Sequence, residues 1–202
     1  EPLESLKLSP LPCRGDRPLA VFSQVKVQYC GRDVCGPVSF ALHPGERVVL
    51  DGKNGSGKSS LLKVLLGESI PHSGTITTSA GLVVSYVPQD TAHLNGLLSH
   101  FAEEHHLDES LFKGILRKMG FERVQFEKKM EDFSAGQKKK VLLAASLCQP
   151  AHLYVWDEPL NFVDLHTRLQ ITSLLRQAQP TMLFVEHDRA FQEEIATQKI
   201  SL

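Results

Sequence analysis

Residues 52–59 read GKNGSGKS, which matches the pattern G-x-x-x-x-G-K-[ST] at every fixed position. The apolar run Val48 to Leu50 precedes this stretch, and leucines at helical spacing follow it. A glycine-rich turn between a strand and a helix presents backbone N–H groups and a helix N-terminus to phosphate oxygens. The stretch therefore predicts a nucleoside-triphosphate site, in which Lys58 reaches the β- and γ-phosphates and Ser59 holds Mg²⁺. The alternative, a chance glycine-rich turn, is disfavoured by the flanking elements.

Outward from this loop, apolar runs of strand length alternate with helical patterns. The predicted order in the second half of the chain is helix 141–148, strand 153–156, helix 165–177, strand 182–185 and helix 189–195. This alternation implies a parallel sheet covered by helices on both faces. Before the loop, β-rich stretches at 19–30 and 37–50 predict short strands, and leucine spacing between 94 and 119 predicts a small helical lobe.

A pair of carboxylates, Asp157 and Glu158, directly follows the predicted strand 153–156. Asp157 suits Mg²⁺ or its water shell, and Glu158 is placed to take a proton from a water that attacks the γ-phosphate. One of the two could instead be a solvated acid at the end of a strand. Two further candidates also follow predicted strands. Gln89, after strand 82–87, is expected to reach Mg²⁺ or the attacking water, and His187, after strand 182–185, is expected to assist catalysis.

Composition limits the remaining possibilities. The chain has 202 residues, 42% of them hydrophobic, so it can bury a substantial core. Its formal net charge of -1 argues against a body that binds nucleic acid by bulk electrostatics, so any RNA contact has to be local. The apolar runs are far shorter than the roughly 18 to 20 residues that span a bilayer, so no membrane insertion is expected. The four cysteines show neither zinc-site nor disulfide spacing, which favours a reducing, cytoplasmic compartment.

Six motifs, in this order and spacing, resemble the ATP-binding cassette (ABC) superfamily: GKNGSGKSS, VPQD, FSAGQ, YVWDEP, NFVD and FVEHD. By this resemblance they are the Walker A loop, Q-loop, signature loop, Walker B strand, D-loop and H-switch. The resemblance implies an α/β fold of the P-loop NTPase (RecA-like) type, with a parallel sheet core, an antiparallel β subdomain and a small helical lobe. It assigns residues 19–202 to the ATPase domain, with the lobe at about 90–134, and leaves residues 1–18 as the end of a linker between cassettes.

The same resemblance extends the set of residues expected to bind ATP and Mg²⁺. Tyr29 is similar to the aromatic residue that stacks on adenine, although a plain core or strand tyrosine is the alternative. Two cassettes of this family pack head to tail, so Ser134, Gly136 and Gln137 are expected to contact ATP held by the other cassette. The expected partner is the first cassette of the same polypeptide, or a second copy of this chain. The Walker A residues expected to bind nucleotide are Asn54, Gly55, Ser56, Gly57, Lys58, Ser59 and Ser60.

Three lysines, Lys138 to Lys140, stand at the predicted start of the apolar helix 141–148. Cations are unfavourable in the first turn of a helix because its N-terminus carries partial positive charge. A triphosphate with Mg²⁺ in the opposite cassette would offset this effect. Successive helical residues point about 100° apart, so not all three lysines can face the same phosphate.

The D-loop, DEPLNFVD at 157–164, is informative about the branch of the family. Asn161 resembles the ABC-F proteins, which act on ribosomes and typically read DEPTNHLD, whereas transporter cassettes more often have Ser or Ala there. The stretch 133–164 is similar to the second cassette of antibiotic-resistance ribosomal protection proteins. Three features depart from the common pattern: Ala135 replaces the second signature glycine, Gln137 replaces Glu, and Leu160 with Phe162 breaks the TNHLD sequence.

The resemblance therefore implies a cytoplasmic ABC-F ATPase whose full-length form acts on the ribosome and its rRNA, with antibiotic resistance as the expected outcome. Hydrolysis is expected to be weak for this chain alone, since its γ-phosphate lacks the other cassette's signature loop. The alternative function is the ATPase subunit of an ABC membrane transporter. A third alternative, a cassette that binds without turnover, is weakened because Lys58, Asp157, Glu158 and His187 are all present.

Overall fold

The structure is a computed structural model that describes residue 3 and residues 6–202. The predicted linker segment 1–18 is therefore only partly described, since residues 1–2 and 4–5 lie outside the described residues. Leu3 is buried in the hydrophobic core, and Leu6 and Leu8 pack against the same core.

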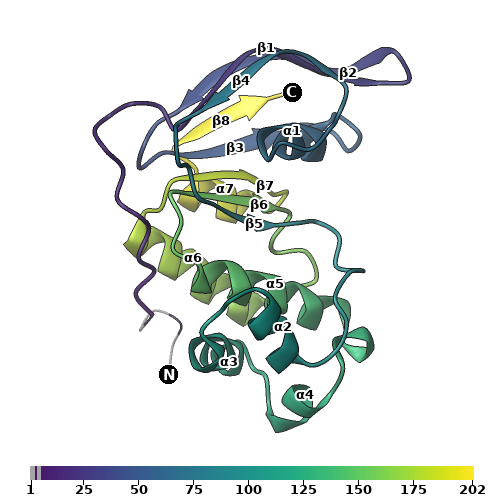
Figure 1. The fold of residues 1–202 in the computed structure, drawn as a ribbon, viewed down its shortest axis with the longest axis vertical. Coiled ribbons are helices and arrows are strands. Elements are labelled where there is room, and N and C mark those ends of the chain that lie inside the picture. Colours follow the sequence, from purple (N-terminus) through teal and green to yellow (C-terminus); the bar gives the residue numbers. More distant parts are fainter. Residues whose placement is uncertain (1–2, 4–5) are drawn as a thin grey trace.

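Two sheets and a group of helices make up the fold (Figure 1). The elements before the helical lobe are β1 Ala20–Tyr29, β2 Arg32–Leu42, β3 Arg47–Asp51, α1 Lys58–Leu65, β4 His72–Thr78 and β5 Val84–Val87. The lobe contains α2 Leu98–Glu104, α3 Glu109–Lys118, α4 Arg123–Glu127 and the 3-10 helix η2 Met130–Asp132. The last part contains α5 Ala135–Cys148, β6 Leu153–Asp157, α6 Leu165–Ala178, β7 Met182–Val185, α7 Arg189–Ile195 and β8 Gln198–Ser201.

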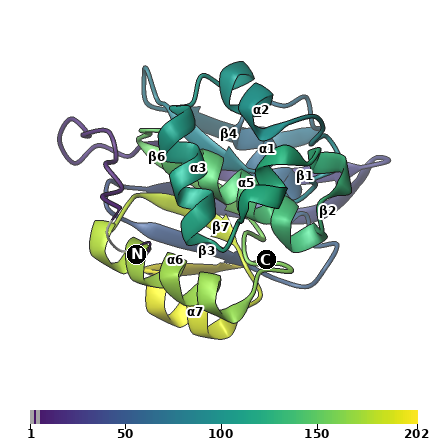
Figure 2. The ribbon, with the colours of Figure 1, turned by 90° about the horizontal axis from the view of Figure 1, so that it is seen from below.

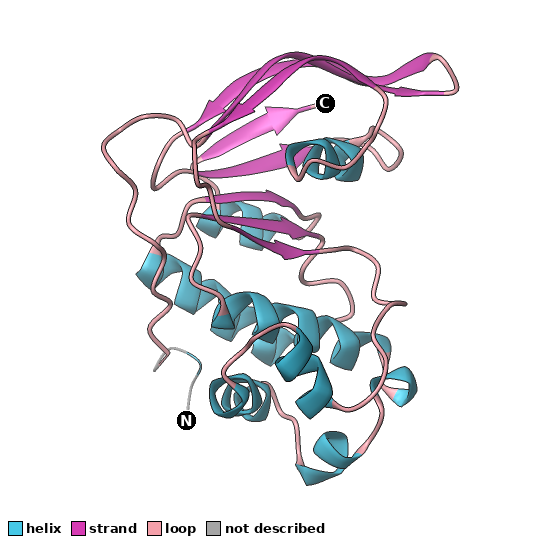
Figure 3. Ribbon diagram, viewed as in Figure 1, coloured by secondary structure: helices cyan, strands magenta, loops and turns pink. Residues whose placement is uncertain are grey.

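The five-stranded sheet has the order β5-β6-β7-β3-β8, and every neighbouring pair in it is parallel. The three-stranded sheet has the order β2-β1-β4, and both of its pairs are antiparallel. Strands lie in the upper part of Figure 3, and most helices lie below them. This arrangement confirms the predicted fold class: an α/β protein with a parallel core sheet, an antiparallel β subdomain and a small helical lobe.

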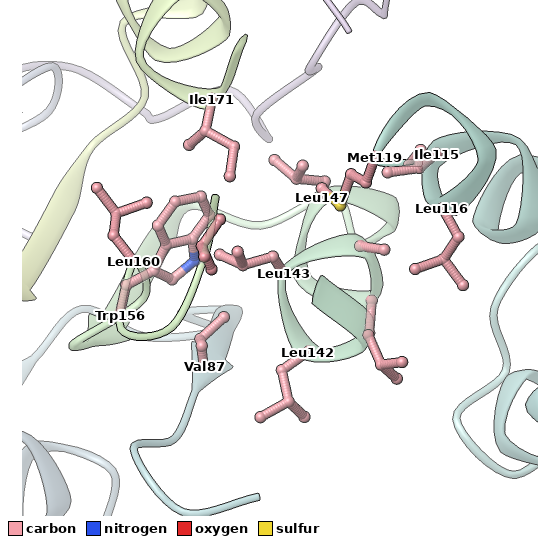
Figure 4. Close-up of a cluster of buried hydrophobic side chains, with 14 of the residues drawn as sticks. Val87, Ile115, Leu116, Met119, Leu142, Leu143, Leu147, Trp156, Leu160 and Ile171 are labelled. Atoms are coloured by element: carbon pink, nitrogen blue, oxygen red, sulfur yellow. The ribbon is translucent and has the colours of Figure 1, made fainter. Parts of the chain in front are cut away.

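Alternating side chains of the parallel sheet divide the interior into two cores. On β6, Leu153 and Val155 pack with α1 and the antiparallel sheet, whereas Tyr154 and Trp156 pack with the helices on the other face. This alternation follows from the two-residue period of a strand. Figure 2 shows the helices spread across the face that carries Tyr154 and Trp156. Figure 4 shows Trp156 beside Leu160 and the α5 residue Leu143, with the α3 residues Ile115 and Leu116 on the other side of α5. The parallel sheet is thus buried on both faces, as its apolar strands predict.

The helix that carries the three lysines differs from the prediction. It begins at Ala135 with Ser134 as its N-cap, six residues before the predicted start at 141. The expectation that Lys138 to Lys140 occupy the first turn is wrong, because Ala135, Gly136 and Gln137 precede them in the helix. The reason is a capping box: the Ser134 hydroxyl accepts from the Gln137 amide, and the Gln137 side chain accepts from the Ser134 amide.

Two of these lysines have partners within the chain. Lys139 is only 2% exposed, and its Nζ donates to the backbone oxygens of Gln89 at 3.1 Å and Pro88 at 3.4 Å. Lys140 donates to the Asp164 carboxylate at 2.6 Å. A negative partner outside the chain is therefore not required to explain either side chain.

Smaller differences concern strands. Strand β5 begins at Val84, two residues after the predicted start, and the strands β4 and β8 lie in segments for which the sequence predicts no strand. Both missed strands are edge strands with mostly exposed residues, so they show no alternation of apolar and polar side chains. Within the described part of the chain, no helix combines the length and the apolar character that crossing a bilayer requires.

Candidate nucleotide-binding site

The carboxyl ends of four parallel strands converge on one edge of the sheet. Strand β3 leads into the glycine-rich loop 52–57, and the other three strands end next to polar side chains: Gln89 after β5, Glu158 after β6 and His187 after β7. Because the strands are parallel neighbours, these side chains meet at the same edge, which is the usual position of a ligand site in an open α/β sheet.

The glycine-rich loop has a backbone that only glycine adopts easily. Gly57, the N-cap of α1, has a φ of 85°, and a Cβ atom at this position would lie 2.7 Å from the Cβ of Cys35. The loop therefore passes close to β2 and turns directly into the helix. Lys58 is 6% exposed, and its Nζ donates to the Gly52 carbonyl oxygen at 2.6 Å. The Lys58 amine is thus held at the glycine-rich loop, and Lys58 lines the pocket over this loop.

A pocket of about 600 Å³ lies over this loop. Its lining residues are Tyr29, Val34, Asn54, Gly55, Gly57, Lys58, Ser59, Ser60, Gln89, Glu158 and His187. The structure therefore brings most of the residues predicted to bind nucleotide into one cavity, together with the predicted catalytic Glu158, His187 and Gln89. Tyr29 lines this pocket and is 57% exposed, so it is not a core tyrosine. It is the last residue of β1, as the alternative of a plain strand tyrosine expects. A pocket of this volume is in the range that holds small-molecule ligands.

Four polar side chains in the pocket form a hydrogen-bonded chain. The Ser59 hydroxyl donates to Gln89 Oε1 at 3.4 Å, and Gln89 Nε2 donates to Glu158 Oε2 at 3.0 Å. The other carboxylate oxygen of Glu158, Oε1, lies 2.9 Å from His187 Nε2. Glu158 is therefore held on both sides by side chains from neighbouring strands. Its backbone φ is 48°, and Phe162 in the same turn has a φ of 64°, so two non-glycine residues adopt left-handed conformations here.

Asp157, at the end of β6, is 1% exposed, and neither of its carboxylate oxygens has a hydrogen-bond partner among the described residues. Burial raises the pKa of this carboxyl, and the nearby Ser59 hydroxyl opposes this effect more strongly than the charge of Lys139 does. A buried carboxylate whose oxygens make no well-formed hydrogen bond is a suitable ligand for a cation. Asp157 lines a smaller, adjacent pocket of about 390 Å³ together with Ser59 and Gln89, which are the other two predicted Mg²⁺ ligands.

The described residues contain no cluster of three or more acidic, histidine or cysteine side chains that could enclose a metal ion. Mg²⁺ commonly binds proteins through one or two carboxylates and completes its coordination with water and substrate phosphates. The donor set of Asp157, Ser59 and Gln89 fits such an ion when it arrives with a nucleotide.

The remaining predicted binding residues lie outside the 600 Å³ pocket. Ser134, Gly136 and Gln137 form the first turn of α5, and none of them lines that pocket. Gly136 packs against the D-loop, because a Cβ atom there would lie 2.5 Å from the Phe162 carbonyl oxygen. Ser56 lies in the glycine-rich loop but outside the lining, and its hydroxyl is buried with no partner among the described residues.

Sequence reasoning missed two residues of this region and the role of a third. Val34 lines the pocket together with Tyr29, and Lys139, expected near a phosphate, instead donates to the Gln89 backbone oxygen. Glu186 is 7% exposed, and its carboxylate accepts from the amides of Leu160 and His187 at 3.1 Å each. Burial raises the pKa of Glu186, while these backbone hydrogen bonds lower it. The only sequence signal for Glu186 was its position directly after a buried strand.

Comparison with known proteins identifies the family of the chain. A family model described as ABC transporter matches residues 35–161, which is more than half of the chain. The chain belongs to the ABC transporter family. As an ABC domain it is an ATP-binding domain of a kind that is typically an ATPase, normally binds ATP with Mg²⁺, and acts in pairs. The glycine-rich loop, the acidic end of β6 and the D-loop start all fall within the matched residues.

Relatives of known sequence include proteins of more than one kind. The chain is 35% identical to the putative ATP-binding protein YdiF of Bacillus subtilis (82% of this chain, 26% of YdiF). It is 30% identical to the ribosome protection protein VmlR of the same organism (80% of this chain, 30% of VmlR). It is also 31% identical to the zinc import ATP-binding protein ZnuC of Buchnera aphidicola (86% of this chain, 76% of ZnuC). The chain thus spans about a quarter to a third of YdiF and VmlR.

Solved structures support the fold. A bacterial Atm1-family ABC exporter with ATP bound superposes on 98% of this chain with a TM-score of 0.78 at 20% identity, and the match covers 39% of the exporter chain. An ATP-binding subunit of an ABC transporter superposes on 91% of this chain with a TM-score of 0.72 at 23% identity, and the match covers 85% of that subunit. At these identities the likeness concerns the fold alone.

Proposed function

We propose that this chain is an ATP-hydrolysing cassette of a cytoplasmic ABC-F protein that acts on the ribosome, and that the whole protein protects the ribosome from an antibiotic. The observation that carries this proposal is the D-loop sequence PLNFVD, together with the similarity to a ribosome protection protein. The 600 Å³ pocket, which Lys58, Glu158 and His187 line, supports the hydrolytic part. Two further relatives, each 32% identical to this chain, support the same branch: the probable ATP-binding protein YheS of Escherichia coli and the ATP-binding protein Uup of Caulobacter vibrioides. The chain takes the place of the second cassette in this proposal.

In the proposed hydrolysis, the N–H groups of the glycine-rich loop and the Lys58 amine hold the triphosphate in the 600 Å³ pocket. Tyr29, exposed at the rim, is placed to stack on the adenine ring. Asp157, Ser59 and Gln89 would hold Mg²⁺, which, when bound, neutralises charge on the phosphates. Lys58, Ser59, Gln89 and Asp157 lie at the carboxyl edge of the parallel sheet, and Tyr29 reaches the pocket from the end of β1.

Glu158 is the proposed general base, because its carboxylate lies in the pocket and can take a proton from water that attacks the γ-phosphate. In the structure both of its oxygens are engaged, one by Gln89 and the other by His187. The Gln89 contact with Glu158 uses Nε2, so Gln89 Oε1 would be available to hold Mg²⁺ while this contact is kept. The His187 contact orients the other carboxylate oxygen of Glu158.

A second cassette is part of this proposal. The N-terminus of α5 is exposed at Ser134 and half-buried at Gly136, and neither residue lines the chain's own pocket, so its N–H groups can face the γ-phosphate of a partner cassette. Next to it, Phe162 is 69% exposed and Leu165 is 70% exposed, and such apolar surface favours contact with another protein. The partner is the first cassette of the whole protein or, for this chain alone, a second copy.

The test is the substitution Glu158→Gln in the whole protein. The amide cannot take up a proton, so the variant should bind ATP, fail to hydrolyse it, and sediment with ribosomes in an ATP-dependent way. Translation should slow in cells that express it. A trapped variant that leaves ribosomes free of the protein would overturn the ribosomal part of the proposal. For the isolated chain, we expect ATP binding with weak hydrolysis that rises steeply with protein concentration.

A second candidate is the ATPase subunit of a membrane transporter, which is favoured by the relationship to ZnuC, because that match covers most of the relative. The same variant separates the two functions. A transporter subunit trapped with ATP should sediment with membranes that contain its permease, and it should remain there when ribosomes are removed.

A further inference from the structure

A second large pocket, of about 580 Å³, lies at the opposite end of the strands that carry the catalytic residues. Its lining residues are Pro12, Cys13, Arg14, Arg17, Leu19, Ser79, Ala80, Gly81, Leu82 and His152. Leu82 precedes β5 and His152 precedes β6, whereas Gln89 and Glu158 follow these strands. Each strand has four or five residues, so at about 3.3 Å per residue the two ends lie roughly 15 Å apart. In Figure 1 the segment before β1 runs along the side of the molecule where the strands start.

The charged residues that line this pocket are two arginines, Arg14 and Arg17, and both are exposed. His152 lines the same pocket beside the turn that precedes β5. Asp16 stands between the two arginines in sequence but does not line the pocket. Within residue 3 and residues 6–202, neither arginine takes part in an ion pair, whereas Arg123, Arg168 and Arg176 do. Two guanidinium groups without carboxylate partners therefore face an open cavity.

The His152 ring is fixed by the backbone. Its Nδ1 accepts a hydrogen bond from the Val83 amide at 2.9 Å, so in the neutral ring the proton is on Nε2. The His152 amide in turn donates to the Val83 oxygen at 2.9 Å. These two contacts hold the ring at the pocket and leave an N–H donor on its other side. The imidazole can thus add a directed donor to the two arginines.

The segment that brings the arginines here is itself tied to the core. The Leu11 amide donates to the Ala151 oxygen at 2.9 Å, and the Leu19 amide donates to the Leu42 oxygen at 2.7 Å. Arg14 and Arg17 lie between these two anchors. Pro12, Leu19, Ala80 and Leu82 form the apolar part of the wall, and Ser79 adds a hydroxyl. The pocket therefore offers cationic donors for a phosphate and an apolar wall for a ribose or a base.

We propose that this pocket binds a nucleotide unit of single-stranded RNA, with the phosphodiester held by Arg14, Arg17 and His152 and the sugar or base packed on the apolar wall. Arginine suits phosphate because its guanidinium presents paired donors. Unpaired RNA is recognised through such combined phosphate and base contacts. A net charge of -1 gives the chain little general attraction for RNA, so RNA binding by this chain requires a local site of this kind. The inference rests on the proposed ribosomal function, because it names the RNA contact of this cassette.

The experiment measures fluorescence anisotropy of a labelled single-stranded oligoribonucleotide with this chain. A Lys58→Ala background prevents phosphate binding in the nucleotide pocket. The double substitution Arg14→Ala/Arg17→Ala should weaken RNA binding about tenfold, and the slope of log K against log salt should fall by about 1.4, or 0.7 for each lost contact. The control is Arg123→Ala/Arg176→Ala, which removes the same charge elsewhere and should change the dissociation constant less than twofold. Thermal unfolding should be unaltered by either double substitution.

Equal weakening in both double variants would overturn the proposal, because the attraction would then be general. The proposal would also be overturned if Arg14 and Arg17 controlled the binding of inorganic phosphate or AMP but the oligoribonucleotide did not bind. Preferential binding of phosphatidylglycerol vesicles over RNA would overturn it as well. If the arginines control RNA binding while the Glu158→Gln whole protein does not sediment with ribosomes, the pocket is confirmed and the ribosomal function fails.

Discussion

The Nε2 atom of His187 lies 2.9 Å from the Oε1 atom of Glu158. The two residues follow neighbouring parallel strands, β7 and β6, and their contact fixes one carboxylate oxygen while Gln89 contacts the other. If Glu158 is the base, replacing His187 with Ala should lower the rate of ATP hydrolysis by about 10². His187→Gln retains a donor and should lose less. Both rates are measured with the paired cassettes at saturating ATP. Equal rates for the wild-type protein and the Ala variant would show that the contact has no catalytic importance.

Gly136 sets the distance between α5 and the D-loop, because a Cβ atom there would lie 2.5 Å from the Phe162 carbonyl oxygen. The substitution Gly136→Ala should destabilise the chain by about 1–3 kcal/mol, since either the D-loop or the helix must move. Gly114→Ala is the matched control. This glycine lies inside α3 with no atom within 4 Å of an added Cβ, and its substitution should stabilise the chain by about 0.5–1 kcal/mol. Urea unfolding measures both, and a neutral Gly136→Ala would contradict the close approach.

Lys139 is a buried cation that binds the backbone of the Gln89 segment. Burial lowers the pKa of its amine, whereas the charges of Asp157, Glu158 and Glu186 raise it. Lys139→Met should cost about 3 kcal/mol in the free energy of unfolding, because the buried carboxylates lose a compensating charge. Lys138→Met, one position earlier and partly exposed, should change stability by less than about 0.5 kcal/mol. Similar effects for the two lysines would mean that Lys139 is not buried in solution.

Asp164 connects α5 and α6, because it accepts from Lys140 Nζ at 2.6 Å and caps α6 through the Thr167 amide at 3.0 Å. Burial raises the pKa of Asp164, but hydrogen bonds from Lys140 and Thr167 outweigh it and hold the pKa at about 2. Since this is below the ordinary value of 3.8, the stabilisation is complete above pH 3.8 and is lost as the pH falls to about 2.

Asp164→Asn keeps a capping residue but removes the charge. Because the side chain is half exposed, we expect the variant to be less stable than the wild-type chain by about 1 kcal/mol at pH 7. The difference should fall to a small fraction of its pH 7 value near pH 2, where about half of the wild-type carboxyl groups are protonated. Denaturation curves from pH 2 to 7 measure it, and a pH-independent difference would rule out the ion pair as its source.

The main features of the site were predictable from short patterns. A glycine-rich loop between a strand and a helix is a local signal, and so is a polar residue directly after a buried strand, as with Glu158 and His187. These signals do not depend on which strands pair. The first-turn position of the lysines was predicted wrongly, because the apolar pattern starts at Val141 while the capping box starts the helix at Ala135. The burial of Lys139 depends on where the Gln89 segment packs, which no local pattern records.

The strands β4 and β8 could not be predicted for a related reason. Strand β4 is exposed or half-buried throughout, and β8 is a four-residue edge strand with only Ile200 partly buried. Their pairing is decided by the neighbouring strands β1 and β3, which lie far from them in sequence. Edge strands of this kind take their structure from the sheet that they join.

The left-handed backbone at Glu158 and Phe162 has a consequence for protein engineering. Each non-glycine residue in this conformation costs on the order of 1 kcal/mol, which a glycine would avoid. A selection for heat resistance alone would therefore favour glycine at both positions and would remove the carboxylate that His187 and Gln89 hold. Thermostable variants of this cassette should be sought at other positions, because glycine at position 158 would raise the melting temperature and at the same time remove the Glu158 carboxylate from the pocket.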